Sequence, residues 1–218
     1  MHNVDITLVY KILKREVAHY KVPVVDLIEI QTKDPFKVLI SAILSTRTKD
    51  ETTVRACERL FTKVRKIDDL ERISVKDLEK LIFPVGFFKN KAKFLKRLPS
   101  VLQEHFNGRI PHTVEELVIL PGVGRKVANL VVAVAFQKPA VCVDVHVHRI
   151  MNRLGYVKTK NPYDTEMALR KKLPMEYWEK INSMLVAFGQ NLCRPVSPKC
   201  SECHIYAQCN RVGVRVSR

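Results

Sequence analysis

The 218-residue sequence has little of what marks a fibrous, low-complexity or membrane-spanning chain. It contains only 7 glycines and 11 prolines, too few for a fibrous or low-complexity chain. The longest uninterrupted apolar run, residues 130–136, is far shorter than the roughly 18 to 20 residues that cross a bilayer. The N-terminal stretch has charges among its apolar residues and no small-residue cleavage site, so we expect no secretory signal. These absences predict a cytoplasmic or nucleoid protein without a membrane partner.

Acidic residues are scarce relative to basic ones. The chain has 38 Lys and Arg against 22 Asp and Glu, which gives a formal net charge of +16. Hydrophobic residues make up 46% of the chain and charged residues 28%, a mixture typical of a globular protein of one or two domains. A strongly basic composition favours a nucleic-acid partner, but anionic membranes and solubilising lysines remain alternatives.

Apolar residues recur mostly at helical spacing, and several of the expected helices begin with a capping signal. The expected capping residues are Asp5, Asp34 before Pro35, Ser74 and Thr113. Residues 175–191 predict one long helix, and Pro99 predicts an interruption or a new turn in the helix before it. One segment disagrees, because residues 141–148 alternate with the period of a strand and no partner strand of similar quality is found.

Four of the six cysteines lie close together near the end of the chain. They are Cys193, Cys200, Cys203 and Cys209. In a reducing compartment, four close thiols more often bind a metal than form disulfides. One close pair with longer arms favours an iron–sulfur cluster over the two close pairs usual for zinc, with zinc, disulfides and free thiols left open. The two remaining cysteines, Cys57 and Cys142, are expected to be small buried hydrophobes.

The segment LPGVGRKVA at residues 120–128 lies between two expected helices at 113–119 and 125–136. Gly122 and Gly124 permit a tight turn around Val123 and a close approach of the backbone to a ligand. Amides at the start of the second helix form an anion site that fits a DNA phosphate, although a plain tight turn is the alternative. Lys126 lies in the first helical turn, where the helix dipole disfavours a cation and partial desolvation would favour an amine nucleophile. A simple phosphate contact is the alternative role for Lys126.

The sequence resembles the endonuclease III family of helix-hairpin-helix DNA glycosylases over nearly its whole length. The resemblance is carried by LPGVGRKVAN, by VDVHVHRIMNRLG, and by the spacing of the four cysteines. Upstream, LISAILSTRTKDETT and VGFFKNKAKFLK resemble two further family segments.

This resemblance implies an all-α fold with two helical domains that flank a DNA-binding cleft. A six-helix domain would span residues 28–138 and contain the hairpin at 113–136. Residues 1–27 with 139–218 would form the second domain, with a [4Fe–4S] loop at 193–209. The resemblance also makes 144–154 a helix, against the alternation of residues 141–148.

The implied function is a bifunctional DNA glycosylase and abasic-site lyase of base excision repair. Lys126 would be the nucleophile and Asp144 its catalytic partner, although Asp144 could also serve as a helix N-cap. The expected substrate is duplex DNA that contains damaged bases or abasic sites, with oxidised pyrimidines of the thymine glycol type removed by a monomeric protein. Alternatives are other target bases (uracil, mismatched thymine or a damaged purine), a non-catalytic DNA-binding module, and an electron carrier.

Further residues are implied to contact DNA. Ser45 and Arg47 belong to the loop that would enter the duplex, and Arg47 stands where Gln is common in the family. Phe87 is the expected wedge, with Phe88 or a core position as alternatives. The other expected DNA contacts are Gly122, Val123, Gly124, His146, Arg149, Arg194 and Lys199. For His146 and Arg149 a structural role is the alternative.

Overall fold

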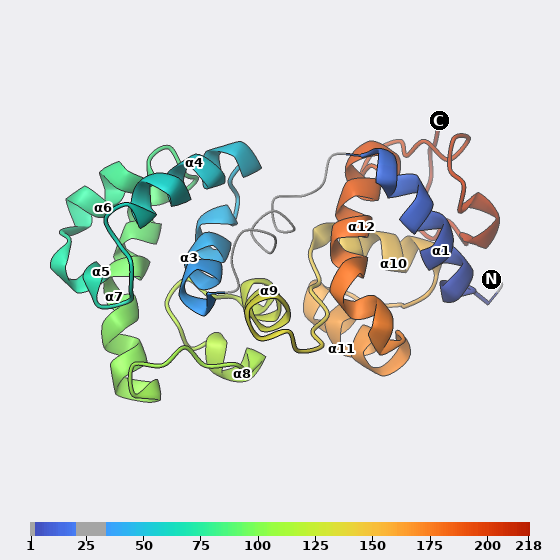
Figure 1. Ribbon diagram of the computed structural model, residues 1–218. Helices are drawn as coiled ribbons and strands as arrows, with labels where there is room; N and C mark the ends of the chain where they lie inside the picture. The colour runs from blue at the N-terminus through green and yellow to red at the C-terminus, as the bar shows by residue number, and fades with distance from the viewer. Residues whose placement is uncertain (1–2, 21–33) are drawn as a thin grey trace. The chain divides into compact units, whose positions relative to one another are not determined.

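The structure is a computed structural model that describes residues 3–20 and 34–218. Within these ranges the regular elements are all helices, as Figure 1 shows, and the all-α prediction is confirmed. None of the described helices is long and apolar enough to cross a membrane. The chain divides into two compact units, one formed by Met1–Pro23 with Pro139–Arg218 and the other by Val24–Lys138.

The unit Val24–Lys138 is built around a central apolar helix. Its described helices are α3 (Pro35–Ser45), α4 (Asp50–Phe61), α5 (Asp69–Arg72), α6 (Val75–Ile82), α7 (Phe88–Phe106), α8 (Val114–Leu117) and α9 (Arg125–Phe136). Every residue of α3 from 38 to 44 is buried, because α4, α7 and α9 pack around it. The end of α3 and the start of α9 therefore rest on the same core, and each carries residues that the sequence assigned to DNA binding.

The predicted capping residues begin helices as expected. The Asp34 carboxylate accepts a hydrogen bond from the Phe36 amide at 2.9 Å, and Pro35 occupies the first turn of α3. Asp5 caps α1 (Ile6–Glu16) in the same way, and Ser74 and Thr113 cap α6 and α8. These side chains accept from first-turn amides that have no partner inside their own helix, and this fixes where each helix begins.

Pro99 does not interrupt its helix, so that prediction is wrong. α7 continues from Phe88 to Phe106 through Pro99. The proline is buried with its neighbours Leu95, Leu98 and Leu102, on the face of α7 that packs into the core. Burial of this apolar face offsets the single backbone hydrogen bond that proline removes from the helix interior.

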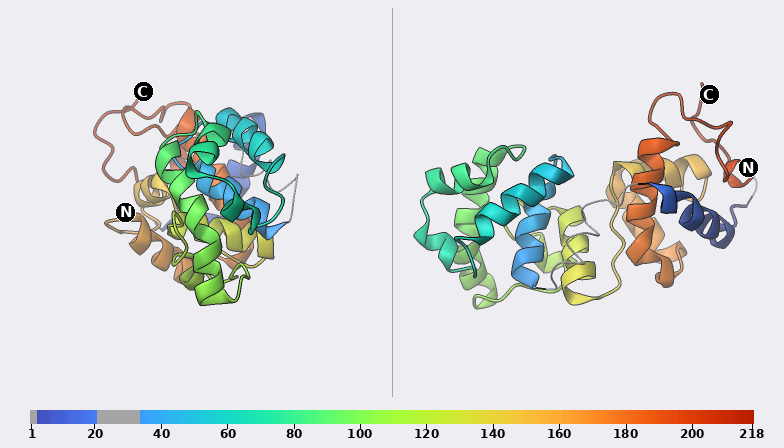
Figure 2. Two further views of the ribbon diagram at one scale, coloured as in Figure 1. Left: turned by 90° about the vertical axis from the view of Figure 1, so that its left-hand side faces the viewer. Right: turned by 45° about the horizontal axis from the view of Figure 1, so that its top comes forward.

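The second unit joins the first helix of the chain to the C-terminal part. It contains α1 (Ile6–Glu16), η1 (Val17–His19), α10 (Val145–Leu154), α11 (Pro162–Lys172), η2 (Met175–Tyr177), α12 (Trp178–Asn191) and η3 (Tyr206–Gln208). α12 packs against both α1 and α10, and the right-hand view of Figure 2 shows α1 beside α12. Val9 and Leu13 of α1 share a core with Phe188 of α12.

Two sequence patterns in this unit differ from the observed elements. The strand expected at 141–148 is absent, because a helix begins at Val145 with Asp144 as its N-cap, which confirms the helix at 144–154. Val141 and Val143 are buried in the segment before this helix. The alternation of apolar residues at 141–148 therefore comes from a segment that packs into the core before the helix begins. The helix expected at 175–191 begins as a separate 3₁₀ turn, η2, before α12.

Candidate functional site

The glycine hairpin between α8 and α9 is held by apolar anchors and one left-handed glycine. Leu120 and Val123 are buried, and the Val123 amide donates to the Leu120 carbonyl at 3.1 Å. Gly122 has φ +79°, and a Cβ there would lie 2.6 Å from the Phe94 ring of α7. The turn therefore needs glycine at position 122 for both its backbone angle and its packing.

Gly124 differs, because space surrounds it. It is the N-cap of α9 without a side-chain cap, and apart from its chain neighbours no described residue has a heavy atom within 4 Å of a Cβ added there. The first-turn amides of α9 are thus approachable from outside, as an anion site at a helix N-terminus requires. Lys126 follows in this turn and is exposed, whereas the sequence suggested partial desolvation.

Asp144 sits in the other unit, at the start of α10. Its Oδ1 accepts hydrogen bonds from the His146 amide at 2.8 Å and the Val147 amide at 2.9 Å. The carboxylate is half-buried and held in one orientation by this cap. The N-cap alternative is therefore correct as far as geometry goes, and it leaves a chemical role for the carboxylate open.

Arg149 and His146 lie together against α12. The Arg149 guanidinium donates to the Gly189 and Cys193 carbonyls at 3.3 and 2.9 Å, and its Nη2 lies 3.2 Å from His146 Nδ1. A Cβ at Gly189 would collide with both side chains, so glycine allows α10 and α12 to approach closely. Burial lowers the pKa of Arg149. These contacts favour the structural alternative for Arg149.

Arg47 and Phe87 form an exposed tip in the unit Val24–Lys138. Both residues have left-handed backbone angles, with φ 52° at Arg47 and 58° at Phe87. Phe87 is 59% exposed, which excludes the core role that we considered for it, and the Arg47 guanidinium lies 5.4 Å from the centre of its ring. Ser45 is half-buried at the end of α3, where its hydroxyl donates to the Ala42 carbonyl at 2.9 Å.

Sequence analysis missed Lys91, which lies beneath this tip and is only 4% exposed. In a chain with 38 basic residues, nothing in the sequence distinguishes a buried lysine from the exposed ones. The burial follows from tertiary packing, since Lys91 lies on the face of α7 that meets the end of α3.

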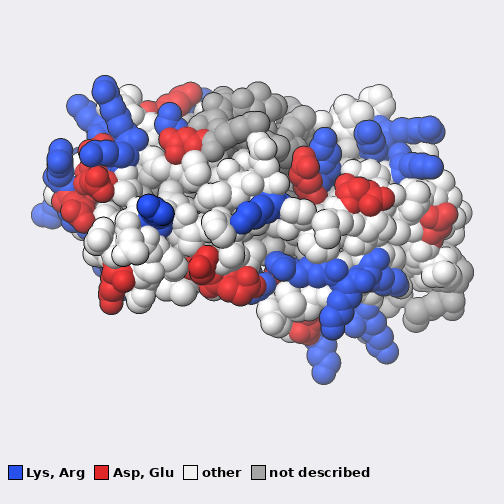
Figure 3. Space-filling view, turned by 60° about the horizontal axis from the view of Figure 1, so that its bottom comes forward, with Lys and Arg blue, Asp and Glu red and all other residues white. Residues whose placement is uncertain are grey.

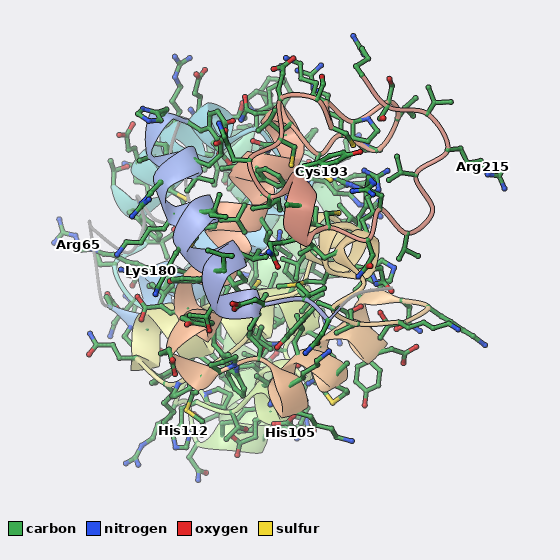
Figure 4. All side chains as sticks on the ribbon, turned by 90° about the vertical axis from the view of Figure 1, so that its right-hand side faces the viewer. Arg65, His105, His112, Lys180, Cys193 and Arg215 are labelled. Carbon is green, nitrogen blue, oxygen red and sulfur yellow. The ribbon has the colours of Figure 1, made fainter. Side chains whose placement is uncertain are left out.

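The four clustered cysteines line one cavity. Cys193 lies where the chain leaves α12 (Figure 4), and Cys200, Cys203 and Cys209 line the cavity with apolar side chains such as Phe188, Leu192 and Ile205. All six cysteines are free thiols. Burial raises the pKa of Cys203 to about 12, and the proximity of the other three thiols acts in the same direction.

The four cysteines bring soft thiol donors, which suit zinc or an iron–sulfur cluster, to one cavity. Within residues 3–20 and 34–218, no three His, Cys, Asp or Glu side chains are arranged to hold a single metal ion. The preference for a cluster over zinc stays a prediction.

Two predicted phosphate contacts belong to the cysteine loop. Arg194 is exposed, and its carbonyl accepts a hydrogen bond from the Arg153 guanidinium at 2.6 Å. Lys199 pairs with Glu202 at 3.0 Å, so its charge has a partner within the loop. Arg215 extends from the loop that follows (Figure 4). Basic side chains gather in several groups on the face in Figure 3, with acidic ones interspersed.

Comparison with known proteins identifies the family. The model of the HhH-GPD superfamily base excision DNA repair proteins matches residues 40–175. The chain belongs to this superfamily. Endonuclease III of Thermotoga maritima is 48% identical over 81% of this chain and 83% of its own length. Endonuclease III of Bacillus subtilis is 36% identical over 83% of each chain. The chain spans 58% of the endonuclease III-like protein 1 of Bos taurus, at 44% identity.

Solved structures of endonuclease III on DNA share the fold of this HhH-GPD protein. A non-covalent endonuclease III–DNA complex covers 94% of both chains with a TM-score of 0.81 at 32% identity. A trapped covalent endonuclease III–DNA intermediate covers 92% of both chains with a TM-score of 0.80 at 33% identity. The resemblance to the endonuclease III family that the motifs suggested is confirmed.

Proposed function

We infer that this member of the endonuclease III family is a DNA glycosylase with abasic-site lyase activity that acts in base excision repair. The observation that carries this inference is a lysine in the first turn of α9, directly behind a hairpin whose Gly124 leaves room for a phosphate. The similarity to a trapped covalent endonuclease III–DNA intermediate supports covalent chemistry at this lysine.

The first step that we propose is extrusion of the damaged nucleotide. A base inside the duplex is out of reach, so it must turn out into a pocket of the enzyme. The exposed pair Arg47 and Phe87 has the form of a probe that fills the vacated space, with Arg47 against the orphaned base and Phe87 stacked on a neighbour. The hairpin Gly122–Val123–Gly124 would hold a phosphate nearby through backbone amides.

The second step is attack by the neutral Lys126 amine on C1′ of the deoxyribose. A C1′–N bond to the lysine forms while the C1′–N bond to the base breaks, and the base leaves with the electron pair. Lys126 is exposed in the protein alone, so bound DNA would have to exclude water and favour the neutral amine. Asp144 would help to remove the amine proton and stabilise positive charge on the sugar, with its orientation set by the α10 cap.

The third step cleaves the strand. Ring opening of the sugar leaves a Schiff base between C1′ and Lys126, which acidifies the protons on C2′. Removal of one C2′ proton forms a double bond between C2′ and C3′ and expels the 3′ phosphate by β-elimination. Hydrolysis of the Schiff base then releases Lys126.

The exposure and the partners of the remaining candidate residues decide how each could contact DNA. Arg194 is exposed on the cysteine loop and is available to a phosphate, whereas Lys199 would have to leave Glu202. His146 packs against Arg149 and Gly189, so we propose that its effect on DNA is to shape the start of α10. We propose that the protein is a monomer with domains at 28–138 and at 1–27 with 139–218, of which the boundary at 27/28 lies outside the described residues.

We also propose a [4Fe–4S] cluster held by Cys193, Cys200, Cys203 and Cys209. When bound, the cluster would act structurally, as a covalent cross-link that orders the loop after α12. Purified protein should contain iron and sulfide in equal amounts and show broad visible absorbance that is lost when these cysteines are replaced by serine. A colourless protein with one zinc ion would contradict the proposal. Cys57→Ser is the matched control, because Cys57 is buried in the other unit against Ser41.

The preferred base is proposed to be an oxidised pyrimidine of the thymine glycol type. A thermostable thymine-DNA glycosylase shares the fold over 83% of this chain at 28% identity, and this similarity keeps mismatched thymine as the second candidate. A panel of duplexes, each with one lesion, separates the candidates by the rate of base release. Thymine glycol should be released fastest, and faster release of mismatched thymine would reverse the assignment.

Borohydride trapping on duplex DNA with one abasic site tests the lyase chemistry. The reductant converts the Schiff base into a stable bond, so wild-type protein should give a covalent adduct and Lys126→Ala should give none. Lys138→Ala is the matched control, since Lys138 is an exposed lysine just beyond the opposite end of α9. A wild-type protein that binds the duplex without forming an adduct would instead be a non-catalytic DNA-binding module.

A further inference from the structure

Lys91 is a buried cation whose partners are all neutral oxygens. Its ammonium donates to the Leu44 carbonyl at 2.8 Å, the Thr46 carbonyl at 2.6 Å and the Thr48 hydroxyl at 3.2 Å. Among the described residues no carboxylate pairs with it. The three donors of one ammonium are thus directed at three acceptors within five residues of chain.

These acceptors belong to the end of α3 and the loop after it. α3 ends at Ser45, so Leu44 and Thr46 present carbonyls at the negative end of the helix dipole. The chain turns sharply at Arg47, which has a left-handed φ of 52°. Arg47 stands between Thr46 and Thr48, the two threonines that Lys91 contacts. Lys91 therefore holds both sides of the turn that projects Arg47.

The same loop is fastened to the turn that projects Phe87. The Gly86 amide donates to the Thr48 hydroxyl at 3.1 Å, and the Lys91 amide donates to the Phe87 carbonyl at 3.0 Å. A Cβ at Gly86 would lie 2.2 Å from the Arg47 carbonyl oxygen, so the two turns touch through their backbones. Thr48 receives bonds from both Lys91 and Gly86 and links the two turns.

We propose that Lys91 is the positioning residue of the tip, holding Arg47 and Phe87 as one rigid pair that fills the duplex when the damaged nucleotide leaves. This proposal rests on the function proposed above. A tip that is already ordered loses little conformational entropy on insertion, and small displacements of a positioned group are costly in rate. The proposal assigns Lys91 no contact with the reacting sugar.

Burial of this ammonium has an energetic cost that a structural filler would avoid. Desolvation lowers the pKa of Lys91 to about 8. A methionine has a similar length and no charge to desolvate, yet it could not bond the Leu44, Thr46 and Thr48 oxygens. The ammonium is thus suited to fixing the loop rather than to filling the core.

The test compares trapping on an abasic site in duplex DNA with trapping on the same strand alone. Only the duplex has an opposite base and a gap to fill, so the ratio of the trapping rates on the two substrates reports on the tip. Lys91→Met should lower this ratio at least about tenfold, with single-strand trapping near the wild-type level. Thr48→Val should lower it in the same direction, and Lys91→Arg should recover part of the loss.

Lys96→Met is the matched control. Lys96 lies on the same helix and donates to the Glu71 and Ile73 carbonyls at 2.5 and 2.9 Å, neither of which belongs to the turns at Arg47 and Phe87. This variant should lower the melting temperature and leave the ratio unchanged. If Lys91→Met keeps the wild-type ratio, or if it is unfolded and Thr48→Val keeps that ratio, the proposal is wrong. Wild-type protein that traps neither substrate would instead refute the proposed function.

Discussion

The two glycines of the hairpin, at the scale of single residues, meet different physical demands. Gly122 has a left-handed backbone and contacts Phe94, whereas Gly124 has an extended backbone and open space around it. Protein packing therefore explains glycine at position 122 only. At position 124 no contact with a described residue accounts for glycine, and we propose that a DNA phosphate approaches the backbone there.

Alanine substitutions separate these demands. Gly122→Ala should reduce the free energy of unfolding by about 1–3 kcal/mol through backbone strain and overlap with Phe94. Gly124→Ala should leave stability unchanged or raise it by about 0.4–1 kcal/mol, yet weaken binding to abasic duplex DNA. Chemical denaturation and fluorescence anisotropy measure the two effects. Wild-type affinity in Gly124→Ala would contradict a phosphate at this position.

Asp144 combines a cap with a proposed chemical role, and two substitutions distinguish them. Asparagine retains the oxygen that accepts from the His146 and Val147 amides, so Asp144→Asn should change stability by less than about 0.5 kcal/mol. Asp144→Ala should cost about 1 kcal/mol. Both should slow base release by about 100-fold or more, because neither can accept a proton. Rates that fall only in Asp144→Ala would indicate a cap alone.

Lys91 also predicts a dependence of stability on pH. Burial lowers its pKa to about 8 from an ordinary 10.5, so between these values the unfolded chain binds more protons than the folded one. The free energy of unfolding of wild type should therefore rise relative to Lys91→Met from pH 8 to 10.5, and the difference should be constant below pH 8. Denaturant titrations of both proteins measure it. A difference that falls across this window would mean that the three hydrogen bonds outweigh desolvation.

At the scale of elements, helix starts could be predicted from the sequence better than helix continuity. Asp34, Ser74 and Thr113 act through bonds to amides two or three residues away, so a local pattern contains the whole interaction. The continuation of α7 through Pro99 depends on burial against distant helices. The strand pattern at 141–148 was misleading for the same reason, because tertiary packing and not a sheet buries Val141 and Val143.

The cysteine loop is the element that should respond most to metal removal. The described contacts that hold the first part of this loop include the Lys199 amide on the Leu192 carbonyl and the Arg153 guanidinium on the Arg194 and Pro195 carbonyls. Trypsin should cleave after Lys199 at least about tenfold faster in chelator-treated protein, because local opening becomes easier. Cleavage after Arg65 in the other unit should not change. Equal cleavage after Lys199 in both samples would mean that no metal orders the loop.

The positive charge of the whole molecule is divided between DNA and the protein itself. Lys91, Lys96 and Lys172 each donate to backbone carbonyls, as do Arg59, Arg149 and Arg153. These cations stabilise helix ends and loops without a carboxylate. The net charge of +16 can be read from the sequence. How many of the basic side chains bond to the protein's own carbonyls depends on the fold.

The salt dependence of binding measures how many basic side chains contact DNA phosphates. The logarithm of the binding constant should fall linearly with the logarithm of salt concentration, with a slope of about −4 to −6 for some five to seven phosphates. Arg194→Ala should reduce the slope by about one, whereas Arg153→Ala should act mainly through stability. Anisotropy titrations on undamaged duplex measure both. A slope near zero would contradict recognition through phosphates.

The pairing of α1 with α12 has a consequence for synthesis on the ribosome. α1 is made first, but Val9 and Leu13 are buried against helices that lie beyond residue 139. At about 5–20 residues per second, this helix waits on the order of ten seconds for its partners. The unit Val24–Lys138 is complete earlier and can fold during that wait. The nascent chain therefore carries an amphipathic helix whose apolar face stays uncovered until α10 and α12 emerge.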